Sequence, residues 1–217
     1  MNIPIGIPGG FAQRHWPARR QESQRHAFSL LEMLLSLALI LIMSVMLYGF
    51  GSRSHQANQK KACQKNLLKI HLALEIFANE HEGSFPALPG AQTAEEPLAL
   101  LVPRYTADTS SFICPGSKDS QLPSGESFAR RKISYAYFMG RRLSDSQEAL
   151  LTDRQVNTQP KNAGQNLFST TGKPPGNNHH KYGGNCLFAD GHVEMISATV
   201  PFSLVWTQGV MLLNPRP

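Results

Sequence analysis

A 23-residue run from Phe28 to Phe50 contains one charged side chain, Glu32, and no proline. A helix needs about 20 residues to cross the bilayer core, so this run is long enough to span a membrane. A secretory signal has a shorter apolar region, of about 7 to 15 residues, followed by a small-residue cleavage site. No such site follows Phe50, so we expect residues 28–50 to stay in the protein as a transmembrane helix.

Glu32 is the fifth residue of this run. A carboxylate inside a membrane segment is costly, so we expect Glu32 to have a function. Residues 1–27 carry half of the net charge of +6 and show no apolar periodicity, and we interpret them as a cleaved basic leader. Basic residues also follow the run, between Arg53 and Lys69, so the charge pattern does not fix the orientation of the helix.

The helix is expected to continue through residues 51–82 with one apolar face. Residues spaced three and four apart form this face: Cys63, Leu67, Ile70, Leu74 and Phe77. Gly83 and Pro86 then predict its end. A helix over residues 28–82 would be about 80 Å long at 1.5 Å per residue, which is too long to be buried in a small domain. Its apolar half must therefore contact lipid or other copies of the chain.

Residues 83–217 predict a small, loop-rich globular part. We expect a helical turn within Pro97–Tyr105, strands at Ser111–Cys114 and Ile133–Phe138, and a surface excursion over residues 144–182. Together with the N-terminal helix, these elements predict an α+β fold in which the long helix packs on a small antiparallel β-sheet.

A β-hairpin is predicted over residues 184–197. Asp190-Gly191 fits a two-residue type I′ turn, which would pair Phe188 with Val193 and Cys186 with Met195. These four apolar residues would then share one face. We expect that face to meet the helix stripe that contains Cys63.

The chain has three cysteines, Cys63, Cys114 and Cys186, without C-x-x-C spacing. This spacing argues against a zinc or thioredoxin-type site. Outside the cytoplasm, one disulfide and one free thiol are expected, and the residues alone leave all three pairings open.

A mixed group of His180, Asp190, His192 and Glu194 lies in and before the hairpin. His192 and Glu194 would share a strand face and are candidate metal ligands, with His179 and His180 folding over them. Calcium prefers oxygen ligands and zinc prefers nitrogen or sulfur, so the mixture specifies neither metal. We therefore expect no bound metal or other cofactor, and the Asp-Gly pair is explained by the turn.

Basic residues bracket the predicted strand that contains Tyr135 and Tyr137. These residues are Arg130, Arg131, Lys132, Arg141 and Arg142. Basic and aromatic side chains together can hold nucleic acid, but charge that protects a solvated edge strand explains them as well. Nucleic acid is therefore kept only as an alternative partner. Because no nucleophile triad, phosphate loop or carboxylate pair stands out, we expect the protein not to be an enzyme.

The stretch Ala27-Phe28-Ser29-Leu30-Leu31-Glu32 and the apolar helix after it resemble the prepilin processing site of type IV pilins and type II secretion pseudopilins. The departure is Ala27, where the family usually has glycine. The resemblance implies that a prepilin peptidase cuts before Phe28 and methylates its new amine. It also implies that Glu32 pairs with the terminal amine of a neighbouring subunit in a filament.

The same resemblance implies a single-pass inner-membrane protein whose C-terminal part lies in the periplasm or on the cell surface. An inner-membrane assembly platform and other pilin subunits would then be its partners. His180, Asp190 and Gly191 are similar to the C-terminal H-X9-DG motif of prepilin-type proteins, and the family-like segments favour a Cys63–Cys114 disulfide.

The expected function is thus a subunit of a type IV pilus-like filament or a type II secretion pseudopilus. The alternatives are a membrane-anchored periplasmic metal-dependent enzyme and a minor pilin that binds DNA.

Overall fold

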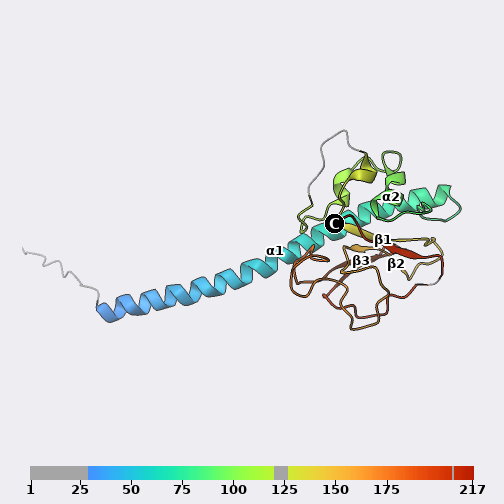
Figure 1. The fold of residues 1–217 in the computed structure, drawn as a ribbon. Coiled ribbons are helices and arrows are strands. Elements are labelled where there is room, and N and C mark those ends of the chain that lie inside the picture. The colour runs from blue at the N-terminus through green and yellow to red at the C-terminus, as the bar shows by residue number, and fades with distance from the viewer. Residues whose placement is uncertain (1–28, 120–126, 207) are drawn as a thin grey trace, which may run out of the picture. The chain divides into compact units, whose positions relative to one another are not determined.

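The computed structural model describes residues 29–119, 127–206 and 208–217 (Figure 1). The chain divides into two compact units, Met1–Met46 and Leu47–Pro217. Helix α1, Leu30–Glu80, is 51 residues long and contributes to both.

In the first unit, the apolar start of α1 has its side chains exposed. The segment Leu30–Leu47 has a mean hydropathy of 2.6, and it is long and apolar enough to cross a membrane. Leu30 and Leu31 are 78% and 75% exposed. Exposed apolar surface of this extent needs a cover of lipid or protein.

The second unit is a five-stranded antiparallel sheet with short helices. The strands are β1 Tyr135–Met139, β2 Ala149–Asp153, β3 Gly184–Phe188, β4 Val193–Ile196 and β5 Met211–Leu213, in the order β4-β3-β2-β1-β5. The short helices are α2 Glu95–Leu98 and the 3₁₀ helices Ala99–Leu101, Thr109–Phe112 and Phe128–Arg130. The predicted α+β class, with a long N-terminal helix and a small antiparallel sheet, is confirmed.

The sheet has an apolar layer on each face. On one face, the α1 stripe that includes Cys63, Leu67 and Ile70 packs with Tyr135 and other inward residues of the sheet. The opposite face forms a second cluster under the long C-terminal loops, and its buried members are Ala136, Phe138, Ala149, Leu167, Phe168, Cys186, Phe188, Ile196, Val200, Leu204 and Leu212. Because side chains alternate along a strand, each central strand contributes to both layers.

Two predictions for the loop-rich region were wrong. Ser111–Cys114 is not a strand, because Thr109–Phe112 forms a 3₁₀ helix whose start is capped by the Asp108 side chain. The stretch 144–182 is not only a surface excursion, since it contains β2, the middle strand of the sheet. Every residue of β2 is buried, so its sequence ALLTD lacks the alternation that marks a half-exposed strand.

The hairpin is present, but its predicted register was wrong by one residue. Leu187 pairs with Val193 and Cys186 with Glu194, and the loop has three residues instead of two. The backbone N–H of Gly191 donates to the Phe188 carbonyl, and Gly191 has a φ of +91°. A three-residue turn that ends in a left-handed glycine needs positive φ only there, whereas type I′ needs it at two positions.

This shift exchanges the two faces of β3. Leu187 and Ala189 lie in the layer that contains Cys63, whereas Cys186 and Phe188 face the opposite layer. The expectation that Cys186 and Phe188 would meet the helix was therefore wrong. Strand β1 also differs from the edge strand expected from its flanking charges, because β2 and β5 pair with it on both sides.

Candidate functional site

The processing-site residues Ala27 and Phe28 lie outside the described residues. Glu32 is in the first turn of α1 and is exposed, with exposed leucines beside it. An acidic side chain at this end of a helix interacts favourably with the helix dipole. No ion pair joins Glu32 to another of the described residues.

The motif residues around the hairpin are exposed, and the structure joins Asp190 to His192 but not to His180. Oδ1 of Asp190 lies 2.5 Å from Nδ1 of His192 and accepts the His192 backbone N–H at 3.0 Å. These contacts lower the pKa of Asp190, the backbone hydrogen bond being the largest cause. His180 has a left-handed backbone with a φ of 57°. Among the residues that the structure describes, no hydrogen bond joins the His180 side chain to this turn.

The candidate metal ligands His192 and Glu194 are not part of a cluster with His179. Nε2 of His192 is 3.9 Å from Glu194, and both side chains are more than 40% exposed. His179, which the metal-site alternative would place above them, is instead buried beside Cys114 and Asp153. The alternative of a metal site at the hairpin therefore lacks His179.

The basic and aromatic group around β1 also differs from the nucleic-acid arrangement. Tyr135 and Tyr137 are both completely buried, so neither ring can stack on a base. The hydroxyl of Tyr137 donates to the carbonyl of Pro86 inside the core. Arg141 is buried too and pairs with Glu148 at 2.8 Å.

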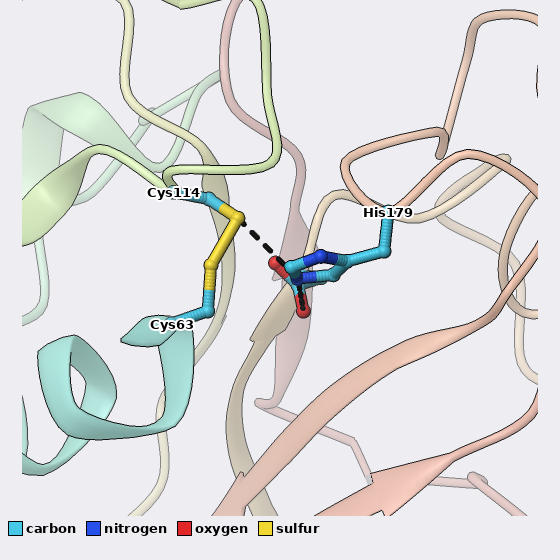
Figure 2. Close-up of side chains that lie close together, drawn as sticks. Cys63, Cys114 and His179 are labelled. Carbon is cyan, nitrogen blue, oxygen red and sulfur yellow. Dashed lines mark hydrogen bonds and ion pairs between the residues drawn. A yellow bond between two sulfur atoms is a disulfide. The ribbon is translucent and has the colours of Figure 1, made fainter. Parts of the chain in front are cut away.

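The main buried polar cluster lies between α1 and the sheet (Figure 2). Cys63 of α1 forms a disulfide with Cys114, leaving Cys186 as the free thiol. Nε2 of His179 lies 3.3 Å from the sulfur of Cys114 and 3.3 Å from Oδ2 of Asp153. These residues are at most 1% exposed. We call Cys63, Cys114, Asp153 and His179 the buried centre.

Neighbouring amides hold the carboxylate of the buried centre. Oδ2 of Asp153 accepts hydrogen bonds from the backbone and side-chain amides of Asn185, and Oδ1 accepts one from Asn178. Asn178 also donates to the backbone carbonyl of Ser134. The cluster thus ties β2 to β3 and to the segment that carries His179, and these donors offset the cost of burying the charge.

Gly116 allows the His179 segment to approach the disulfide closely. A Cβ at this position would lie 2.4 Å from the carbonyl oxygen of Asn178 and 2.6 Å from Nδ1 of His179. Such contacts are too close for any other residue, so the Pro115-Gly116 turn has a packing role. No local spacing in the sequence links Asp153, Asn178 and Asn185, so their grouping was not predicted.

Two further titratable groups border the sheet. Burial raises the pKa of the Cys186 thiol, which lies in the layer away from α1. Burial lowers the pKa of Lys60, and the charge of Asp153 opposes that lowering. The Lys60 ammonium donates to the carbonyls of Tyr182 and Ile196 and so joins α1 to the edge of the sheet.

Comparison with known proteins addresses the N-terminus. The prokaryotic N-terminal methylation motif matches residues 23–48. The chain has a prepilin-type N-terminus. This match covers Ala27, Phe28 and Glu32 and the apolar first half of α1, as the predicted resemblance requires. The H-X9-DG resemblance of His180, Asp190 and Gly191 stays a prediction. No curated protein and no solved structure matches the chain.

Proposed function

We propose that the protein is a pilin-like subunit that is cut before Phe28, methylated there and assembled into a filament. The filament is a type IV pilus-like fibre or a type II secretion pseudopilus. The methylation motif at residues 23–48 is the observation that carries this proposal. In this role the protein is a structural subunit and not an enzyme.

The exposed start of α1 supports assembly. Its leucine, isoleucine and methionine side chains are mostly more than half exposed, and they would be covered by lipid before assembly and by other subunits afterwards. Glu32 would pair with the Phe28 amine of a neighbouring subunit. Each charge is costly alone in an apolar bundle, and pairing offsets that cost and fixes the axial register.

The same features support a membrane location. The prepilin peptidase would act on the cytoplasmic face, α1 would cross the inner membrane once, and residues 83–217 would lie in the periplasm or on the cell surface. An inner-membrane platform would extract the subunit into the filament. A disulfide in the second unit is consistent with an oxidising compartment of this kind.

The test is the N-terminal sequence and intact mass of the protein purified from its native membranes. We expect a chain that begins at Phe28 and carries one added methyl group. An Ala27→Leu variant should stay uncut, because the processing site requires a small residue before Phe28. An unprocessed wild-type chain in cells with an active prepilin peptidase would overturn the proposal.

A further inference from the structure

The buried centre combines four side chains of types that bind zinc in proteins. We propose that Cys63, Cys114, His179 and Asp153 bind one Zn²⁺ ion when the two cysteines are thiols, as they are before the disulfide forms. The disulfide and the zinc complex are then alternative states of one site. This inference concerns the second unit alone and does not depend on filament assembly.

The positions of the ligand atoms fit a tetrahedral ion. One nitrogen, oxygen or sulfur atom from each of the four residues lies within 4.8 Å of all the others. With Zn–S of about 2.3 Å and Zn–N of about 2.0 Å, a tetrahedral site separates sulfur from nitrogen by about 3.5 Å. The distance from Cys114 to His179 Nε2 is 3.3 Å, and that from Nε2 to Asp153 Oδ2 is also 3.3 Å.

The two sulfur atoms must move apart. A tetrahedral site with such bonds places them about 3.8 Å apart, so the bonded pair has to open on reduction. Cys63 is on α1 and Cys114 lies in the turn after the 3₁₀ helix Thr109–Phe112, so the two thiols belong to different elements. A modest rotation of either cysteine side chain can therefore separate the two sulfur atoms without disrupting a helix or strand.

The surroundings suit a closed structural site. All four residues are buried, which leaves no open position for a substrate. Hydrogen bonds from Asn178 and Asn185 hold the Asp153 carboxylate, as the outer groups of metal sites hold ligating carboxylates. Two thiolates, one carboxylate and Zn²⁺ sum to one negative charge. The Lys60 ammonium can balance this negative charge. The charge of Asp153 raises the pKa of Lys60 and so opposes the lowering caused by burial.

Metal binding by the reduced chain involves no redox step. Each cysteine thiol releases its proton to solvent, and the two thiolates with neutral His179 and ionised Asp153 bind the ion. A disulfide has no thiolate to offer, so the oxidised protein loses two of its four ligands. The chain therefore has the complete set only as a dithiol.

The experiment uses the full-length protein in detergent, treated with a chelator and reduced with a phosphine. The phosphine is oxidised to its oxide with oxygen from water as the disulfide becomes two thiols. Zn²⁺ affinity is measured by competition with a chromogenic chelator, and stoichiometry by elemental analysis. Co²⁺ is a spectroscopic probe, because thiolate ligands give a charge-transfer band and a tetrahedral site gives intense visible bands.

We expect one Zn²⁺ per reduced chain and no comparable binding by the oxidised chain. His179→Asn should weaken binding at least about 100-fold, since losing even an outer partner of a ligand costs about 10- to 100-fold. His180→Asn is the matched control and should bind as the wild type does. Asparagine is used at both positions because it tolerates the left-handed backbone of His180.

Three outcomes would overturn the proposal. They are the absence of zinc binding by the reduced chain, equal binding by oxidised and reduced chains, and equal binding by the two histidine variants. If reduction unfolds the second unit, Zn²⁺ should restore the native near-ultraviolet circular dichroism, because binding then drives folding. Failure to restore that signal would also count against the site.

Discussion

Asp153, at the end of β2, accepts both the backbone and the side-chain amide of Asn185 on β3, at 2.7 Å and 3.1 Å. The two bonds join β2 and β3 just beyond the last regular pair of these strands, in which Thr152 lies opposite Cys186. The carboxylate thus closes the end of the sheet that faces the disulfide and His179.

Replacing Asp153 with alanine should therefore destabilise the second unit strongly. Three buried donors, two from Asn185 and one from Asn178, would lose their acceptor. Each unsatisfied buried group costs about 1–3 kcal/mol, so we expect a loss of at least about 3 kcal/mol. Urea unfolding of the full-length protein in detergent measures this loss. Glu194→Ala, at an exposed position of β4, is the control and should change the stability by less than about 0.5 kcal/mol. Equal effects of the two substitutions would contradict the role given to Asp153.

Removing the disulfide should also lower the stability. Cys63 and Cys114 are 51 residues apart in sequence, and closing a loop of that length restricts the unfolded chain by about 4 kcal/mol on the chain-entropy model. The double variant Cys63→Ala and Cys114→Ala should show most of this loss in urea unfolding without reductant. In the control Cys186→Ala, stability should still fall when reductant is added. A double variant as stable as the wild type would show that the cross-link has no such effect.

Local patterns in the sequence predicted much of the fold. The apolar run after Phe28 is continuous, and the stripe from Cys63 to Phe77 repeats with the helical period, so neither depends on distant residues. The Asp190-Gly191 pair likewise located a hairpin. Turn length was not predictable, because Gly191 suits both a two-residue and a three-residue loop. That single ambiguity reversed the faces of Cys186 and Phe188.

The resemblance favoured the Cys63–Cys114 disulfide, but the rest of the buried centre was not predictable, because its parts come from four distant segments. Asp153 ends an apolar strand and His179 lies in a polar loop, so each resembles an ordinary residue of its surroundings. Cys63 and Cys114 also lack the short spacing that marks a metal or redox site. Only packing α1 on the sheet brings these side chains within contact of one another.

Gly191 allows the hairpin turn to approach α1. A Cβ there would lie 2.9 Å from the His71 ring, and the φ of +91° is strained for any other residue. Gly191→Ala should cost more than about 1 kcal/mol in urea unfolding, from backbone strain and the clash together. Gly164→Ala is a matched control, because its φ is +85° and nothing lies within 4 Å of the added Cβ. Equal losses for both glycines would show that backbone strain alone, and not the clash with His71, causes the loss.

The turn should also respond to acid through Asp190. The His192 backbone N–H, and next its imidazole, lower the pKa of Asp190 in the folded state. A lowered folded pKa contributes stability above the unfolded value of about 3.9, and this stability is lost as pH falls through the folded pKa. The stability difference between wild type and Asp190→Ala should therefore shrink as the pH falls below about 3.9. His192→Gln keeps the backbone bond and should preserve most of the difference, whereas a difference independent of pH would contradict this coupling.

Glu32 should be required for assembly but not for processing. Glu32→Ala leaves the apolar segment and the residues next to the Phe28 bond intact, so the variant should still be cut and methylated. In a filament it would leave the amine of a neighbouring Phe28 unpaired in an apolar bundle. Breaking a buried pair costs about 3–5 kcal/mol, so incorporation should fall more than 100-fold when wild-type and variant chains compete. Quantitative immunoblotting of sheared filaments against membranes measures this ratio. Glu75→Ala, an exposed position of α1 in the second unit, should be incorporated as the wild type is. Normal incorporation of Glu32→Ala would mean that another contact fixes the register of the subunits.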